Sequence, residues 1–302
     1  MSAEENAVIL VAGATGILGS QICRLLVEQG KTVRALVRST SDPGKVHKLK
    51  QLGVELVVGD LKDRPSLDAA CQGVASVITT VATTLSRQPD DSIRATELEG
   101  QKSLVDAASA AGVQHFVYTS VTGTLPSWGI FLETRRAVEE YVKQSGMAYT
   151  ILRPNYLMDL WLGPGVGFDI ANARVQVFGS GEGKINWAAL GDVLQFAVQA
   201  LDHPTARNAT LELGGTDWLS QMDVIRLCEE IGGRPFAIQH VPEETLQEQA
   251  NTAMDEYEQT FAILMLCVAR GQSHAVDMQE TLQAFPVQLT SVRDYARTTL
   301  SR

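Results

Sequence analysis

The feature that most constrains the fold is the segment Ala7–Gly19, an apolar run that leads into glycines spaced three residues apart. Val8 to Val11 are aliphatic, as is typical of a strand buried on both faces of a parallel sheet. After Gly16 the apolar residues recur at helical spacing until Gly30, which ends the pattern. This order brings backbone amides and the positive end of a helix toward a phosphate group. The segment therefore predicts a dinucleotide-binding turn; an ordinary strand–turn–helix built of small residues is the alternative.

Each glycine of this turn has its own predicted role. Gly13 allows the sharp turn out of the strand, and Gly16 leaves no side chain between the backbone and a phosphate. Gly19 lets the helix pack closely against the sheet. Thr15 and Ile17, which flank Gly16, are predicted to contact the same ligand.

Strand and helix patterns alternate through the first half of the chain. Strands are predicted at 8–12, 32–37, 54–58, 75–80, 115–119 and 148–152. Helices are predicted between them at 17–29, 44–52, 65–72, 92–111 and 131–145. Such alternation indicates right-handed crossovers and a parallel sheet covered on both faces. We predict an α/β protein with a Rossmann-type doubly wound parallel sheet, whose ligand binds beyond the carboxyl ends of the strands.

The second half of the chain has a different pattern of predicted turns, strands and helices. It contains glycine-rich turns at 163–167 and 179–183, a strand at 175–178, and helices at about 191–201, 221–231, after Pro242 and at about 290–300. We therefore predict a dinucleotide-binding domain at 1–154 and a smaller α/β lobe at 155–302 that holds a substrate or partner. The two are expected to be interleaved, with segments at about 185–215 returning to the sheet.

Composition excludes several classes of protein. The net charge of −10, with no cluster of Lys and Arg, argues against a nucleic-acid partner. The four cysteines lie far apart and suggest buried thiols in a reducing compartment rather than a metal site, so no metal is expected. Residues 1–6 do not resemble a signal or transit peptide, and the longest apolar run, 261–269, is too short to span a bilayer. We expect a cytoplasmic protein without a transmembrane segment, as a monomer or homodimer.

The end of the second predicted strand bears on which dinucleotide is bound. An acidic residue there selects NAD through the ribose hydroxyls, but this strand ends in Arg38 and Ser39. A guanidinium at that position suits the 2′-phosphate of NADP, which it can hold bidentately. Arg38 and Ser39 are therefore predicted to select NADP; a solvated arginine after a strand is the alternative.

The ends of the next two strands supply further candidates. Asp60 follows the third strand and is placed to accept a hydrogen bond from the adenine amino group, with Leu61 packing on the base. A plain turn aspartate is the alternative for Asp60. Thr80 and Val81 follow the fourth strand, where the backbone is expected to pass the second ribose.

The chain resembles the NmrA-like members of the atypical short-chain dehydrogenase/reductases over roughly its first 240 residues. The motifs that carry this resemblance are Gly13-x-x-Gly16-x-x-Gly19, Val37-Arg38, Gly59-Asp60-Leu61, Phe116-Val-Tyr-Thr-Ser120, Val138-Glu139 and Ser145-Gly-Met-Ala-Tyr-Thr-Ile-Leu-Arg-Pro-Asn155. The resemblance implies a Rossmann-type sheet, NADP in the cleft and a substrate site formed by the smaller lobe. It also implies that Thr119, Arg135, Pro154, Asn155 and Tyr156 contact the dinucleotide.

The wider superfamily uses a serine, a tyrosine and a lysine, the last two spaced Tyr-x-x-x-Lys. The resemblance assigns the serine to Ser120. Counting back from Glu139, however, the lysine position holds Arg135 and the tyrosine position holds Phe131. Phe131 has no proton to give, and arginine does not replace lysine freely. Tyr156, which follows Arg153-Pro-Asn, is the best remaining phenol, so the catalytic candidates are Ser120, Arg135 and Tyr156.

Three functions are compatible with these residues. The first is an NADPH-dependent oxidoreductase that transfers hydride to a small apolar or quinone-like substrate, for which water can supply the proton. The second is a non-catalytic protein that senses NADP(H) and acts through a protein partner. The third, a sugar-nucleotide epimerase, needs the missing tyrosine and lysine. We favour the first.

Overall fold

The computed structural model describes residues 7–84, 87–126 and 128–301. The acidic residues 1–6, used above for the predicted location, are outside this range. The chain divides into two compact units. The first comprises residues up to 120 together with 133–152 and 194–211, and the second comprises 121–132, 153–193 and 212 onward.

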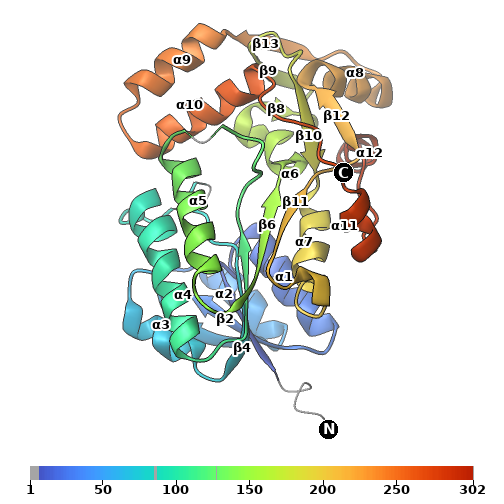
Figure 1. The fold of residues 1–302 in the computed structure, drawn as a ribbon. Helices are drawn as coiled ribbons and strands as arrows, with labels where there is room; N and C mark the ends of the chain where they lie inside the picture. Colours follow the sequence, from blue (N-terminus) through green and yellow to red (C-terminus); the bar gives the residue numbers. More distant parts are fainter. Residues whose placement is uncertain (1–6, 85–86, 127, 302) are drawn as a thin grey trace. The chain divides into compact units, whose positions relative to one another are not determined.

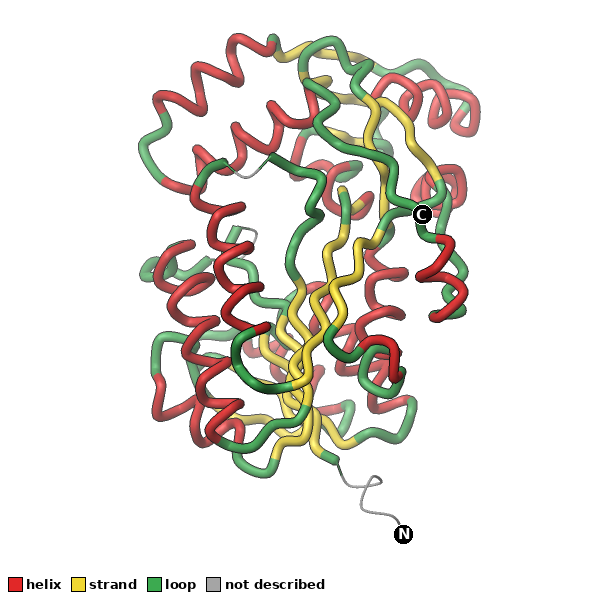
Figure 2. The backbone as a smooth tube through the Cα atoms, in the orientation of Figure 1, coloured by secondary structure: helices red, strands yellow, loops and turns green. Residues whose placement is uncertain are grey.

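The first unit is built on a seven-stranded sheet (Figures 1 and 2). The strand order is β11 (Ala209–Leu213), β6 (Ala148–Pro154), β5 (His115–Thr119), β4 (Val74–Thr79), β1 (Val8–Ala12), β2 (Thr32–Val37), β3 (Glu55–Val58). The pairings from β6 to β3 are all parallel. Since β2 and β3 lie on one side of β1 and β4 lies on the other, the order reverses between β1 and β4. This confirms the predicted doubly wound sheet.

Helices cover both faces of this sheet. They are α1 (Ile17–Glu28), α2 (Pro43–Gln51), α3 (Arg64–Cys71), α4 (Gln101–Ala110), α5 (Ile130–Lys143) and α7 (Leu190–Gln199). Figure 1 shows α3, α4 and α5 on one side of the sheet and α1 on the other. On the first side, Leu67, Leu104 and Val138 are fully buried in one apolar cluster with Leu10 of β1. The apolar stripes seen in the sequence therefore form the core.

The predicted helix at 92–111 is not uniform. Its first part, Ile93–Gly100, is π-helical, and the α-helical part α4 begins at Gln101. A Cβ on Gly100 would lie 2.8 Å from the Cβ of Leu61, so the π-helical segment runs directly against the chain after β3. The apolar pattern of these few residues predicts a helix but not its hydrogen-bond pattern. The sequence therefore does not distinguish the π-helical part from the α-helical part.

The second unit contains two small sheets. One has the order β12 (Asp217–Ser220), β10 (Lys184–Ala188), β7 (Tyr156–Leu157), and the other β13 (Ala237–Val241), β9 (Arg174–Phe178), β8 (Phe168–Asp169). Its α-helices are α6 (Met158–Trp161), α8 (Gln221–Gly232), α9 (Glu243–Thr252), α10 (Glu256–Ala269), α11 (Gln279–Ala284) and α12 (Val292–Leu300). Short 3₁₀ turns lie at Pro164–Val166 here and at Pro204–Ala206 in the first unit.

The ends of the helices in the second unit follow from local sequence. α8 begins with a capping box, in which Ser220 and Asp223 each accept the other's backbone amide, and Gly233 ends the helix with φ +65°. The long helical stretch after Pro242 is two helices. Asp255 begins the second by accepting the amides of Tyr257 and Glu258. Within the described ranges, no helix has both the length and the apolar content needed to cross a membrane.

Candidate functional site

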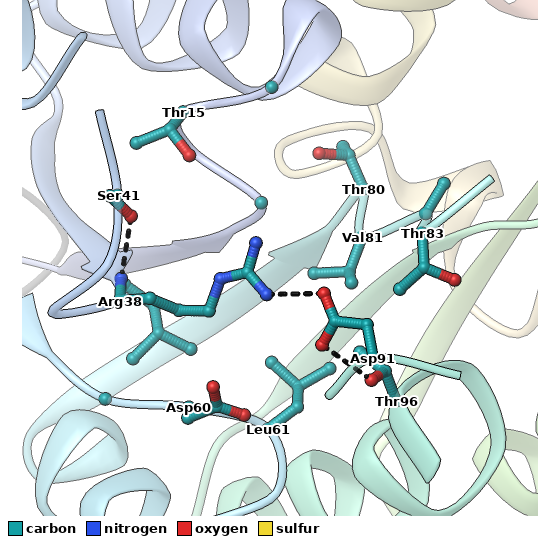
Figure 3. A pocket seen from close by; sticks show the side chains of 15 residues that line it. Thr15, Arg38, Ser41, Asp60, Leu61, Thr80, Val81, Thr83, Asp91 and Thr96 are labelled. Atoms are coloured by element: carbon teal, nitrogen blue, oxygen red, sulfur yellow. Dashed lines mark hydrogen bonds and ion pairs between the residues drawn. The ribbon is translucent and has the colours of Figure 1, made fainter. Parts of the chain in front are cut away.

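A cleft in the first unit lies where β1, β2, β3 and β4 end (Figure 3). The space in and above it is about 640 Å³, part of which is open to solvent. Its lining consists of Gly13, Thr15, Gly16, Leu36, Arg38, Ser41, Gly59, Asp60, Leu61, Thr80, Val81, Ala82, Thr83, Asp91 and Thr96. The structure therefore brings together predicted ligand-binding residues from four separate loops, at the switch point of the sheet where ligands of this fold bind.

The turn after β1 and the start of α1 have no room for a side chain at Gly13 or Gly19. Gly13 has φ +82°, and a Cβ there would lie 2.8 Å from Oγ1 of Thr80. A Cβ on Gly19 would lie 2.2 Å from the carbonyl oxygen of Gly13. The amide of Gly16 donates to the same carbonyl at 2.9 Å and closes the turn. Gly13 is thus required by its positive φ and by the close approach of Thr80, and Gly19 by the close packing of the helix on the turn.

α1 begins beside this cleft, since its N-cap residue Gly16 is part of the lining, and the first amides of a helix have no acceptor within the helix. Gly16 is the N-cap residue and provides no side-chain acceptor, and the first turn contains no acidic residue. Ile17, the first residue of the helix, is 67% exposed, so its side chain does not pack over the end of the helix. An uncapped helix N-terminus next to glycines is suited to bind an anion such as a pyrophosphate.

Arg38 extends from the end of β2 across the cleft to Asp91 (Figure 3). Its Nη1 donates to Oδ2 of Asp91 at 2.7 Å. The chain then turns tightly, since the amide of Ser41 donates to the carbonyl of Arg38 and the Arg38 amide donates to Oγ of Ser41, both at 3.0 Å. This turn places Ser41 on the cleft, whereas Ser39 is exposed. Ser41 therefore lines the cleft together with Arg38, and a contact of Ser39 with the 2′-phosphate stays a prediction.

Asp91 precedes the π-helical segment, and its side chain is fully buried. Besides Arg38, it accepts hydrogen bonds from Nζ of Lys62 at 3.0 Å, from Oγ1 of Thr96 at 3.1 Å and from the amide of Gln88 at 2.8 Å. Burial alone would raise the pKa of Asp91, but the hydrogen bonds from Gln88, Arg38 and Lys62 lower this pKa to about 2. Asp91 is therefore ionised at neutral pH, with two cations in contact.

Asp60 makes the turn interaction that the sequence offered as the alternative to an adenine contact. Its Oδ1 accepts the amide of Lys62 at 2.9 Å, which is the turn interaction typical of aspartate. The residue also lines the cleft beside Leu61, which is buried. Asp60 as a partner of the adenine amino group stays a prediction.

Ser120 and Arg135 belong to a buried polar network in the first unit. Ser120 donates to Glu139, and Nη2 of Arg135 contacts Oε2 of Glu97 at 2.5 Å. The other oxygen of Glu97 accepts both the amide and the hydroxyl of Thr83, each at 2.6 Å. Arg135 is only 3% exposed and also donates to the carbonyl of Thr119 at 3.3 Å. The charge of Arg135 is paired with Glu97 inside the protein. A contact between Arg135 and a ligand stays a prediction, and this pairing argues against it.

Tyr156 is placed in the apolar core of the second unit. Its ring lies 5.2 Å from that of Trp161 and 6.4 Å from that of Trp187, edge to face. Its hydroxyl is buried and has no hydrogen-bond partner among the described residues. Burial, followed by the nearby Cys267, raises the pKa of Tyr156 well above its usual value. A phenol with a raised pKa gives up its proton less readily than an ordinary tyrosine. The neighbouring Asn155 is also buried.

The comparison with known families agrees with this geometry. The model of the NmrA-like family matches residues 5–296. The chain belongs to the NmrA-like family. Two relatives and one solved structure illustrate the range of that similarity.

An NAD(P)H azoreductase from Xenophilus azovorans is 34% identical over 247 residues, which cover 82% of this chain and 80% of that protein. The photosystem II assembly factor Ycf39 of Guillardia theta is 32% identical over 78% of this NmrA-like chain and 73% of its own. A triphenylmethane reductase from Citrobacter sp. has the same fold, with a TM-score of 0.79 at 22% identity, over 98% of this chain and 100% of its own. The proteins to which this chain is similar therefore include some named as reductases and some named as assembly factors.

Changing Tyr156 to Phe separates a structural from a catalytic role for this phenol in the NmrA-like chain. Because the hydroxyl is buried without a partner, we expect Tyr156→Phe to keep or raise the free energy of unfolding by up to about 1 kcal/mol. Turnover with a reducible substrate is expected to stay within about twofold of wild type. Thermal unfolding and steady-state kinetics measure both. A hundredfold fall in kcat at unchanged stability would instead assign proton transfer to Tyr156.

Proposed function

We propose that this NmrA-like protein is an oxidoreductase that uses NADPH to reduce small, apolar, planar substrates of the quinone or azo class. The observation that carries the proposal is the cleft that unites the glycine turn, the open amides of α1 and the Arg38 guanidinium. The relative named as an NAD(P)H azoreductase supports the reaction type. The proposed ligand is a small molecule, and the proposed compartment is reducing, because all four cysteines are free and buried.

Different residues of the cleft would contact different parts of the dinucleotide. The turn at Gly13–Gly16 and the first amides of α1 would hold the pyrophosphate. Arg38 and Ser41 would face the 2′-phosphate, and Asp60 and Leu61 the adenine. The backbone at Thr80 and Val81 would pass the second ribose. When bound, NADPH supplies a hydride to the substrate.

The proton that accompanies this hydride needs no phenol from the protein. A quinone or azo substrate that accepts hydride becomes an anion, which water can protonate. Ser120 does not serve as an acid on its own, because its hydroxyl already donates to Glu139. This limits the proposed substrates to those whose reduction leaves a stabilised anion, and it argues against simple ketones.

Arg38→Gln tests the proposal. The variant removes the cation but keeps two donor hydrogens and most of the length. We expect the preference for NADPH over NADH, measured as the ratio of kcat/KM values with one quinone or azo substrate, to fall to about one because the contact to the 2′-phosphate is lost. The kcat/KM value with NADH should change less than about twofold. Loss of activity with both coenzymes to the same extent would contradict the role given to Arg38.

A second function is favoured by the network around Arg135. With Phe131 in the tyrosine position and Arg135 paired to Glu97, the chain would act as a dinucleotide-binding assembly or regulatory protein without turnover. The relatives named as photosystem II assembly factors support this alternative. Incubation with NADPH and a panel of quinones and azo dyes distinguishes the two: tight coenzyme binding without oxidation of NADPH by any acceptor would favour the second function.

A further inference from the structure

The charges that line the cleft do not match a site selective for a phosphate group. Among the described lining residues, Arg38 is the only cation, while Asp60 and Asp91 are both carboxylates. A phosphate monoester such as the 2′-phosphate of NADP carries about 1.5 to 2 negative charges at neutral pH. The cleft thus offers a single positive charge, and that charge already has a partner in Asp91.

Asp91 is held in place independently of Arg38. The amide of Gln88, the hydroxyl of Thr96 and the ammonium of Lys62 all donate to its carboxylate within 3.1 Å. Its side chain has no exposed surface, whereas that of Arg38 is 25% exposed. When an anion binds, the guanidinium is therefore the group that moves or shares its hydrogens, and Asp91 stays.

We propose that Asp91 sets the coenzyme selectivity of this site by competing with the 2′-phosphate for Arg38. This inference rests on the proposed function. A coenzyme without the 2′-phosphate leaves the Arg38–Asp91 pair intact. A coenzyme with the 2′-phosphate gains a contact to Arg38 but loses part of the Arg38–Asp91 pair. The two effects offset each other, so the protein accepts NADH as well as NADPH.

The first test uses the wild-type protein. Calorimetric titration with NADPH and with NADH is expected to give dissociation constants that differ by less than about tenfold, in favour of NADPH. A preference of more than about a hundredfold in either direction would overturn the proposal. If neither coenzyme binds, the proposed function fails first, and this outcome overturns the inference with it.

The second test compares Asp91→Asn with Asp90→Asn. Thr96 donates to Oδ1 of Asp91 and Gln88 to Oδ2, so an asparagine keeps an acceptor oxygen for one of the two. Asp90 contacts Lys62 at 2.6 Å with a 75% exposed side chain. Both variants remove one negative charge at adjacent positions. We expect Asp91→Asn to bind NADPH about tenfold more tightly with little change for NADH, and Asp90→Asn to leave the ratio within about twofold. Weaker NADPH binding by Asp91→Asn would show that Asp91 positions Arg38 instead, and would overturn the proposal.

The double variant Arg38→Gln/Asp91→Asn completes a cycle. If Asp91 acts through Arg38, its removal gains nothing once Arg38 is absent, and the double variant matches Arg38→Gln for both coenzymes. A tenfold gain that persists without Arg38 would assign the effect to the general charge of the cleft and would overturn the competition. Should Asp91→Asn fail to fold, the wild-type ratio still decides the inference.

Discussion

The Glu97→Gln variant is expected to lose about 3–5 kcal/mol of its free energy of unfolding. Glu97 has no exposed surface and lies within 2.5 Å of the Arg135 guanidinium, which is itself 3% exposed. Replacing the carboxylate by an amide removes the negative charge that lies against this buried guanidinium. It also replaces the charged acceptor of the two Thr83 donors by a weaker one. Denaturant unfolding followed by circular dichroism measures the loss.

Glu140→Gln is the matched control for this prediction. Glu140 lies on the same helix as Arg135 and contacts Lys143 at 2.7 Å, but its side chain is 61% exposed. The control is therefore expected to lose at most about 1 kcal/mol. Equal stability of the two variants would mean that the Glu97–Arg135 pair does not hold the structure, and Arg135 would then be available to a ligand after all.

The Gly19→Ala variant is expected to lower kcat/KM for the coenzyme about a hundredfold, because displacements near 1 Å at a binding turn have effects of this size. A methyl group there would lie 2.2 Å from the carbonyl oxygen of Gly13 and 2.9 Å from Oγ1 of Thr80. Either α1 moves away from the sheet or the turn opens, and both displace the amides that face the pyrophosphate. Overpacking of this kind also lowers the free energy of unfolding by about 1–3 kcal/mol.

Gly191→Ala provides the comparison for this substitution. A Cβ on Gly191 meets nothing within 4 Å among the described atoms, and neither Gly191 nor Gly19 has a positive φ. The two variants therefore differ in the space available and not in backbone strain. Wild-type kinetics for Gly19→Ala would show that the turn tolerates a side chain, contrary to the packing described above.

The first unit was predictable because its signals are local. Buried parallel strands are short apolar runs, and the helices between them repeat every three to four residues, so β1 to β6 and their helices follow from the sequence. Cleft residues at strand ends were predictable for the same reason: a strand that ends in Gly13, Arg38, Asp60 or Thr80 delivers that residue to the switch point.

The residues missed by sequence reasoning are fixed by contacts between distant segments. Asp91 pairs with Arg38, which lies 53 positions earlier, and nothing near Asp91 in the sequence indicates this partner. The pairing of Arg135 with Glu97 is likewise absent from any local pattern. In the second unit, strands such as Tyr156–Leu157 are two residues long and too short to have a period. Their position follows from packing alone.

The most direct test of the central claim is calorimetric titration of NADPH into the purified protein at physiological salt. The account predicts saturable binding of one NADPH per chain, with a Kd in about the micromolar to submillimolar range. Binding should be strongly weakened in Gly19→Ala, and its preference over NADH should be lost in Arg38→Gln. The absence of saturable binding for both NADPH and NADH would contradict the assignment of the cleft as a nicotinamide dinucleotide site.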